Sequence, residues 1–389
     1  MSEFDLVVVG AGIHGAGVAQ AAAAAGSSVL LLEEREIAWG TSSRSSKLIH
    51  GGLRYLERAN FGLVRESLRE RKILLSIAPH LVSLVDFHIP VYRDTSRRPW
   101  QLRTGLSLYG MLAGFGKDAQ FASLPRAEWS ALDGLSTDGL QAVLRYKDGQ
   151  TDDARLTRAV VQSAVEMGCS LRLGARWLSA QRENDVYNVS WSEGAVVHEC
   201  TASAVVLAAG PWNSLLQGRC TPKGPMPQVE LVGGTHIELE GPLVRGIYYV
   251  ESPQDRRAVF VMPWRGHTLI GTTETPWSGA PEAVEPSAAE VEYLGLCLER
   301  YFPEHPSKFI AAWAGLRVLP KESASPFARS REVQFAVDNP DSVRRVAIYG
   351  GKLTGYRATA LKVLERLGNA MPQRARKADT ATLRLPDPN

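Results

Sequence analysis

Cysteine is scarce in this sequence, with four residues in 389 and no CxxC pair. Their spacing matches neither a disulfide framework nor a set of metal ligands, so we expect no metal site. The thiols are expected to be reduced and to fill the core of a cytoplasmic protein. They are Cys169, Cys200, Cys220 and Cys297.

An excess of charge of one sign is also absent. The 44 Lys and Arg residues against 41 Asp and Glu leave a formal net charge of +3. So small a charge argues against a nucleic-acid partner and requires any anion to be recognised by a local cluster of cations. Internal repeats and low-complexity tracts are absent too, and the length then predicts a globular protein of two domains.

No long hydrophobic run is free of interruption. The most apolar stretch, residues 4–33, begins beside Glu3 and Asp5, is broken by four glycines between positions 10 and 17, and holds the polar His14 and Gln20. A signal peptide would begin with basic residues. We therefore expect no signal peptide and no membrane span here, and a cytoplasmic location.

The same stretch has the pattern of a βαβ unit. Residues 6–9 are a continuous apolar run, followed by GAGIHG, an alanine-rich helix that ends at Gly26, and a second strand at 29–32. Such glycines let backbone approach a pyrophosphate at a helix N-terminus, and an acid after the second strand binds a ribose. The alternative is a glycine turn with a purely structural role. The predicted dinucleotide contacts are Gly10, Gly12, Ile13, His14, Gly15, Glu33 and Glu34.

Residues 41–57, TSSRSSKLIHGGLRYLE, are rich in hydroxyls and cations and have almost no apolar face. Two later strands, 203–209 and 343–349, also end in glycine turns. A dinucleotide held by pieces so far apart is typical of FAD rather than of a nicotinamide cofactor. We expect Lys47 to balance negative charge on the reduced flavin; the alternative is a solvated serine-rich loop. The expected flavin contacts are Thr41, Ser42, Ser45, Ser46 and Lys47.

Eight motifs occur in a characteristic order: GAGIHGAG, TSSRSSKLIHGGLRYLE, TDDARL, AAGPW, VFVMPW, LIGTTE, AGLRVLP and GGKLTGYR. Over residues 4–386 they resemble the FAD-dependent, quinone-linked glycerol-3-phosphate dehydrogenases of the D-amino-acid-oxidase structural superfamily. The resemblance implies an α/β fold (α+β overall), in which a Rossmann-like FAD-binding domain carries a discontinuous, mostly antiparallel β substrate-binding cap. It also implies oxidation of sn-glycerol 3-phosphate to dihydroxyacetone phosphate, with electrons passed to a quinone.

The resemblance assigns roles to single residues. It adds Leu48, Gly210, Trp212, Gly351 and Leu353 to the flavin contacts. It places His50 near the flavin ring. The residues that it places around both substrate and flavin are Arg54, Tyr55, His236, Arg317, Lys352 and Thr354.

The sequence departs from the family pattern at three motif positions. Val318 stands where the family has a proline beside the key arginine, Gly355 replaces the second threonine of GGKLTTYR, and Glu274 replaces the aspartate of GTTD. The family also continues past the point that matches Pro386 into a helical C-terminal domain, which this sequence is expected to lack. Every substrate-contacting motif is present.

Oxidation of a secondary alcohol needs a hydride acceptor, a base for the hydroxyl proton and a handle that fixes the substrate. A phosphate dianion is a strong handle for a cationic cradle, here Arg54, Arg317 and Lys352 with Tyr55. The candidate bases are His50, which we prefer, and His236. Each has an alternative reading, His50 as a loop residue that forms hydrogen bonds and His236 as a solvated residue of an alternating strand.

Three other functions stay open. An oxidase of the same substrate would pass its electrons to O2 instead of a quinone. An amino-acid or 2-hydroxy-acid oxidoreductase would need one arginine for a carboxylate rather than the whole cradle. A flavin-binding protein without turnover is the third.

The two domains are expected to interleave along the chain. We assign residues 1–78, 145–222 and 315–389 to the FAD-binding domain, and 79–144 and 223–314 to the cap. Within the cap, 257–263 and 268–273 predict a hairpin, and Ser287 with Glu290 predicts the capping box of a helix. Residues 373–389 are expected to form a loose tail.

Residues 93–117 combine four arginines with several aromatic and aliphatic residues. This composition suits a segment on the surface of an anionic membrane, and equally a buried cap helix with basic flanks. We therefore expect, at most, peripheral association with the inner face of the cytoplasmic membrane. The oligomeric state is left open.

Overall fold

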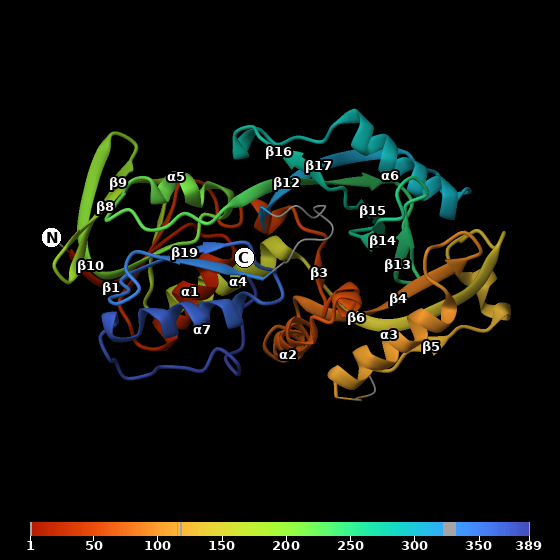
Figure 1. The fold of residues 1–389 in the computed structure, drawn as a ribbon, viewed down its shortest axis with the longest axis horizontal. Coiled ribbons are helices and arrows are strands. Elements are labelled where there is room, and N and C mark those ends of the chain that lie inside the picture. The colour runs from red at the N-terminus through yellow and green to blue at the C-terminus, as the bar shows by residue number, and fades with distance from the viewer. Residues whose placement is uncertain (1, 115, 117–118, 322–331, 389) are drawn as a thin grey trace.

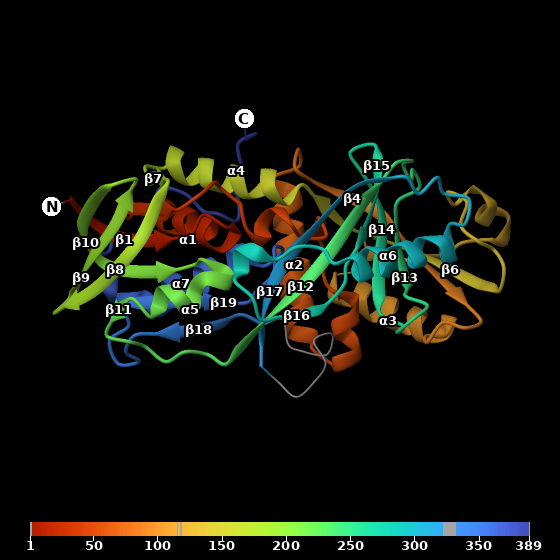
Figure 2. The same cartoon turned by 90° about the horizontal axis from the view of Figure 1, so that it is seen from above.

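The structure, a computed structural model, describes residues 2–114, 116, 119–321 and 332–388. Two β-sheets lie side by side along the long axis of the molecule (Figure 1). Figure 2 shows strands β12 (Val229–Leu239) and β17 (Phe309–Pro320) in the middle, between the two halves.

The first sheet has a parallel centre. β1 (Ser2–Val9) pairs in parallel with β2 (Val29–Glu33) and β10 (Val196–Leu207), which pairs in parallel with β19 (Arg345–Tyr349). β7 (Ser170–Leu173) extends it beyond β2, and β18 (Gln334–Val337) pairs antiparallel with β19. The predicted βαβ unit and both later strands are confirmed. They are recognisable because strands buried on two faces read as continuous apolar runs.

Helices cover both faces of this sheet. α1 (Ile13–Ala24), α4 (Asp153–Glu166) and α7 (Tyr356–Leu367) pack together, and α5 (Asn213–Gln217) lies on the other side (Figure 1). Every residue of α1 except His14 is buried, which its run of small alanines permits. β9 (Val186–Glu193) pairs antiparallel with β10 and with β8 (Ala175–Glu183), and β11 (Cys220–Thr221) pairs in parallel with β8. All four cysteines are buried and unpaired in a disulfide.

The second sheet is mostly antiparallel. Around β12 and β17 it contains β13 (Ile247–Glu251), β14 (Ala258–Trp264), β15 (His267–Gly271) and β16 (Thr275–Trp277). β4 (Val82–Tyr92), β6 (Leu140–Thr151), β3 (Leu48–Ile49) and β5 (Ala122–Ser123) complete it. The β14–β15 pair is the predicted hairpin. This pairing of a Rossmann-like sheet with an antiparallel one confirms the predicted fold class.

Three further helices pack around the second sheet. They are α2 (Phe61–Ile77), α3 (Pro99–Leu112) and α6 (Ala288–Tyr301). The predicted capping box is present at α6, where Ser287 Oγ accepts from Glu290 N at 3.2 Å and Ser287 N donates to Glu290 Oε2 at 3.1 Å. Two strands, β6 and β17, run across the expected domain limits at 144/145 and 314/315, so these limits stay predictions.

The C-terminal segment is not the expected loose tail. Lys377 N donates to the Ala24 carbonyl and Leu385 N to the Ile77 carbonyl, both at 2.8 Å. Arg374 pairs with Asp5 at 2.8 Å, and Leu385 is buried. This packing could not be predicted from the sequence, because the segment is mostly polar. Its partners are the carbonyl groups of the last residues of α1 and α2. These carbonyl groups accept no hydrogen bond within their own helices.

The segment 93–117 forms helix α3 with one buried face. Leu102, Leu106 and Tyr109 are buried, whereas Trp100 and Met111 are exposed. Residues 115 and 117 of this segment lie outside the described residues. Among the helices that the structure describes, none is both long and apolar enough to cross a membrane.

Candidate active site

A cavity of about 610 Å³ is lined by residues of both sheets. Its lining includes the turn after β1, the loop at 39–48, the turns after β10 and β19, and strand β17. Most of the residues singled out from the sequence line it: Gly10, Gly12, Ile13, His14, Glu33, Glu34, Thr41, Ser42, Ser45, Ser46, Leu48, His50, Arg54, Tyr55, Gly210, Trp212, Arg317, Gly351, Lys352, Leu353 and Thr354. Gly15, Lys47 and His236 do not.

The turn between β1 and α1 requires glycine. Gly10 has φ +100°, and a Cβ there would lie 2.8 Å from the Ala208 carbonyl oxygen. A Cβ on Gly15 would lie 1.8 Å from the Gly10 carbonyl oxygen. Gly15 therefore shapes the turn from behind rather than facing the cavity. The result exposes the N-terminal end of α1, with Ile13 and His14, to the cavity.

Side chains of the second strand and the serine-rich loop hold this turn in place. Glu33 accepts hydrogen bonds from Ala11 N at 2.7 Å and Arg35 N at 2.8 Å, and its burial raises the pKa of the carboxyl group. Ser42 Oγ accepts from Ile13 N at 2.9 Å. The loop is thus an ordered wall of the cavity and not a solvated segment.

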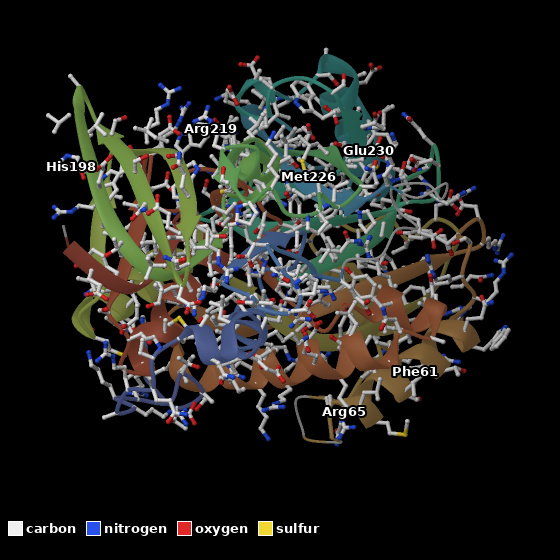
Figure 3. The ribbon with its side chains drawn as sticks, turned by 60° about the vertical axis from the view of Figure 1, so that its left-hand side comes forward. Phe61, Arg65, His198, Arg219, Met226 and Glu230 are labelled. Atoms are coloured by element: carbon white, nitrogen blue, oxygen red, sulfur yellow. The ribbon has the colours of Figure 1, made fainter. Side chains whose placement is uncertain are left out.

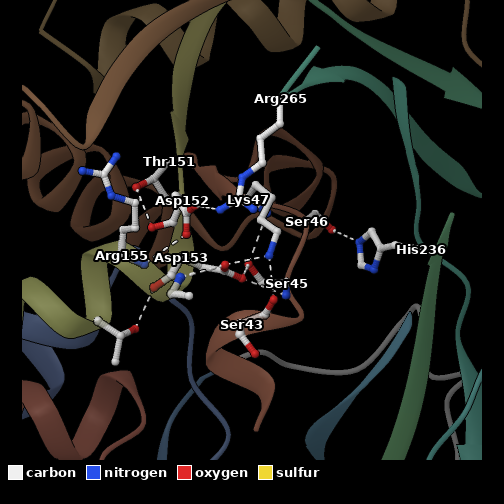
Figure 4. Close-up of polar contacts among 12 residues, drawn as sticks. Ser43, Ser45, Ser46, Lys47, Thr151, Asp152, Asp153, Arg155, His236 and Arg265 are labelled. Carbon is white, nitrogen blue, oxygen red and sulfur yellow. Dashed lines mark hydrogen bonds and ion pairs between the residues drawn. The ribbon is translucent and has the colours of Figure 1, made fainter. Parts of the chain in front are cut away.

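Lys47 has a partner that the sequence did not reveal. Its Nζ lies 2.6 Å from Asp153 Oδ1 and donates to the Ser43 carbonyl at 2.6 Å (Figure 4). Ser45 Oγ also donates to Asp153, at 2.6 Å. Lys47 does not line the cavity and fixes the loop to α4. That its charge balances the reduced flavin ring stays a prediction.

His236 lies behind the cavity lining. It is 1% exposed, its Nε2 lies 2.9 Å from Ser46 Oγ, and its ring stacks on Trp313 with centroids 5.9 Å apart (Figure 4). Burial, with the nearby charges of Arg317 and Lys47, holds the pKa of His236 well below its usual value. The reading of His236 as a solvated strand residue is wrong, because its side chain is buried and stacks on Trp313 of the paired strand β17.

His50 lines the cavity directly. Its backbone N–H donates to Thr354 Oγ1 at 3.2 Å. Burial lowers the pKa of His50 to about 4, with Asp148 opposing the shift and Lys352 and Arg54 reinforcing it. The imidazole is therefore neutral at physiological pH and able to accept a proton.

The structure brings together cations from three distant parts of the chain. Arg54 lies on the 3-10 helix η2 (Leu53–Arg58), Arg317 on β17 and Lys352 in the turn after β19, and all three line the cavity. Lys352 Nζ lies 3.9 Å from the centre of the Tyr55 ring, and the Arg54 guanidinium carbon 5.2 Å from it. Arg317 donates from Nη2 to Thr272 Oγ1 at 3.0 Å.

Sequence reasoning missed several lining residues. Arg257 at the start of β14 and Glu274 after β15 lie at the cavity and pair at 2.9 Å. Tyr249 and Phe260 add aromatic surface. The motif LIGTTE could have indicated Glu274 as a site residue, because the family that the sequence resembles has an acid at this position. Tyr249 and Phe260 lie on strands. The alternation of side chains along a strand shows which residues share a face, but not which face lines a cavity.

Comparisons with known proteins fit this site. A family model described as DAO, FAD dependent oxidoreductase, matches residues 5–349. The aerobic glycerol-3-phosphate dehydrogenase of Escherichia coli (strain K12) is 36% identical over 378 residues, which cover 94% of this chain and 74% of that protein. The D-erythritol 1-phosphate dehydrogenase of Brucella abortus (strain 2308) is 35% identical, covering 95% of this chain and 74% of that protein. The X-ray structure of the glycerol-3-phosphate dehydrogenase from Bacillus halodurans complexed with FAD superimposes with a TM-score of 0.74 at 27% identity, covering 98% of this chain and 68% of that chain.

Proposed function

Because the chain belongs to the DAO family of FAD-dependent oxidoreductases, we propose that it oxidises sn-glycerol 3-phosphate to dihydroxyacetone phosphate. The resemblance that its motifs indicated is thereby confirmed at the level of the family. The observation that carries the substrate assignment is the convergence of Arg54, Arg317 and Lys352 beside a neutral His50 in one cavity.

The residues present fit FAD. The turn at Gly10 is too close to Ala208 for any side chain, and it leaves backbone at the N-terminus of α1 open to an anionic pyrophosphate. Further residues assigned to FAD line the same cavity: Glu33, Ser46, Leu48, Trp212 and Leu353. A volume of about 610 Å³ lies within the usual range of cofactor sites. When bound, FAD supplies the hydride acceptor.

The chain's cations are assigned to the phosphate. Arginine presents a planar fork of donors that matches phosphate oxygens, and lysine adds a compact charge. Arg54, Arg317 and Lys352 bind and orient the phosphate group, and the Tyr55 ring lies next to both Arg54 and Lys352. A clamp of this kind fixes the position of the neighbouring carbinol carbon.

The proton of the substrate hydroxyl is assigned to His50. A general base must be unprotonated and within reach of the substrate, and His50 is the histidine of the pair that lines the cavity. His236 instead contacts Ser46, so we assign it the role of positioning the loop.

The proposal also includes the identity of the electron acceptor and peripheral binding to a membrane. We propose a quinone as the electron acceptor; relatives at about 35% identity are named dehydrogenases. Exposed apolar side chains on the contacting helices α2 and α3 (Phe61, Trp100 and Met111) offer a surface for peripheral binding to an anionic bilayer. Figure 3 shows Phe61 and Arg65 at the edge of the molecule opposite to Arg219 and Met226.

An anaerobic titration tests the function. Addition of glycerol 3-phosphate to the purified holoenzyme is expected to bleach the flavin absorbance, and erythritol 1-phosphate and D-amino acids serve as competing substrates. If only an amino acid bleached the flavin, the chain would be an amino-acid oxidoreductase of the same family and the proposed substrate would be wrong. Reoxidation by a soluble quinone analogue and by O2, measured side by side, identifies the acceptor. Sedimentation with vesicles containing phosphatidylserine, for the wild type and Trp100→Ser, tests the membrane surface.

A further inference from the structure

A carboxylate lies among the cations of the candidate substrate site. Glu274 follows β15, its side chain is 5% exposed, and it lines the same cavity as the arginines. Its Oε2 lies 2.9 Å from Arg257 Nη2, and its Oε1 lies 3.8 Å from Arg317 Nη1. A carboxylate in a phosphate-binding site should by itself weaken phosphate binding, because the two negative charges repel each other.

The surroundings of Arg317 explain the acid. Arg317 Nη2 donates to Thr272 Oγ1 at 3.0 Å, and Nη1 donates to the Thr273 carbonyl at 3.2 Å. The residues 272–274 thus contact the guanidinium through three successive groups, the last of which is the Glu274 carboxylate. A planar fork held on one edge has a fixed orientation.

Glu274 also holds Arg257, which directly precedes β14. Its Nη2 meets the Glu274 carboxylate, and its Nη1 lies 3.5 Å from the Glu274 carbonyl oxygen. The influence extends to a third arginine. Burial alone would lower the pKa of Arg54, and the charges of Tyr55 and Glu274 raise it. One acid therefore interacts with arginines from η2, from the start of β14 and from β17.

We propose that Glu274 is a positioning residue of the phosphate site, which orients Arg257 and Arg317 toward the substrate, and that Arg257 is a further phosphate-binding residue. This inference rests on the proposed function for the identity of the substrate. It predicts that the loss of the acid weakens phosphate binding, although it removes a negative charge from the site. A purely electrostatic view predicts the opposite sign.

The test compares Glu274→Gln, which keeps the shape and removes the charge, with Glu274→Asp, which keeps the charge. For Glu274→Gln we expect KM for glycerol 3-phosphate to rise about tenfold or more with a smaller change in kcat, since the ion pairs that orient Arg257 and Arg317 are lost. The dissociation constant of inorganic phosphate for the holoenzyme, measured by calorimetry, is expected to rise by a similar factor. Glu274→Asp is expected to restore most of both quantities.

A matched control removes an acid that is outside the cavity. Glu240 on the neighbouring loop pairs with Lys308 at 2.7 Å, and both side chains are exposed. Glu240→Gln is expected to leave KM and phosphate affinity unchanged. Arg257→Gln tests the second half of the proposal and is expected to raise both constants as Glu274→Gln does.

Each outcome separates the inference from the function on which it rests. If the wild type reduces its flavin with glycerol 3-phosphate but Glu274→Gln binds phosphate as well as or more tightly than the wild type, the positioning role is overturned and the function stands. If no polyol phosphate reduces the flavin, the proposed function is lost, and the calorimetric comparison still decides the role of Glu274. A wild type that neither reduces its flavin with a polyol phosphate nor binds inorganic phosphate overturns both.

Discussion

Lys47 and Asp153 form a buried ion pair, with Nζ and Oδ1 2.6 Å apart and side chains 6% and 0% exposed. Asp153 is the first residue of α4, so the pair joins the serine-rich loop to a helix of the first sheet. Lys47 Nζ also lies 5.4 Å from the centre of the Trp264 ring in the second sheet. One ammonium group therefore connects the loop to both halves of the molecule.

Replacement of Lys47 by methionine should destabilise the fold strongly. The substitution leaves Asp153 buried without its cation, which costs about 3–5 kcal/mol of unfolding free energy. Urea denaturation of the holoenzyme measures the change. The double variant Lys47→Met/Asp153→Asn is expected to lose less than the sum of the single variants, because the two residues act as one unit.

The exposed pair Lys308–Glu240 is the control for this prediction. Its side chains are 72% and 48% exposed, so Lys308→Met should change the unfolding free energy by less than about 1 kcal/mol. Equal effects at Lys47 and Lys308 would contradict the structural role that we give to the buried pair.

Gly15→Ala should disrupt the dinucleotide turn. The new Cβ would lie 1.8 Å from the Gly10 carbonyl oxygen, so the turn must open and the purified protein should lose flavin absorbance. Gly62→Ala is the matched control, because Gly62 lies in helix α2 with open space at its Cβ position. It should retain FAD and gain up to about 1 kcal/mol of stability. Full flavin content in Gly15→Ala would refute the assignment of this turn.

The strands and glycine turns of the first sheet could be predicted because their signals are local. The apolar run at 6–9 and the positive φ that Gly10 supplies are properties of neighbouring residues. The convergence of Arg54, Arg317 and Lys352 could not be derived from spacing, since nothing local fixes how distant segments meet. It followed from resemblance to a family.

The missed contacts have the same physical origin. Lys47 and its partner Asp153 are separated by 106 positions. The local sequence therefore predicts the charge of Lys47 but not the residue with which it pairs. His236 and Glu238 lie on the same face of β12, opposite to Ile237, and this alternation fixes the face of His236 but not what covers that face. In the structure β17 places Trp313 opposite His236, and the histidine is buried while Glu240 is exposed.

The stability of the protein should fall as the pH falls from 7 to 5, in part because of His50. The pKa of His50 is about 4 in the folded protein and near 6.5 in an unfolded chain, so the unfolded chain binds the proton first. Stability from this residue is present above pH 6.5 and declines by about 2 kcal/mol at pH 5. Urea denaturation at the two pH values should show a smaller loss in His50→Gln, which cannot titrate, than in the wild type. An identical pH dependence in both would show that His50 titrates normally.

Tyr109→Phe should impair catalysis from outside the cavity. The Tyr109 hydroxyl accepts from Gly51 N at 2.8 Å and donates to Asp148 Oδ2 at 2.6 Å, and Asp148 Oδ1 is held by Arg71 at 2.6 Å. Removal of the hydroxyl leaves the buried Gly51 N–H unsatisfied, which should cost about 1–3 kcal/mol of unfolding free energy.

Because Gly51 follows His50 directly and precedes the helix that carries Arg54, a small displacement there should lower kcat/KM for glycerol 3-phosphate by about tenfold or more. The control is Tyr293→Phe, whose hydroxyl donates to Asp255 at 2.8 Å at an exposed site and should change neither quantity appreciably. Steady-state kinetics with saturating FAD separate the two variants. If Tyr109→Phe kept the kinetics of Tyr293→Phe, the geometry of His50 would have to be set by contacts other than the Gly51 hydrogen bond.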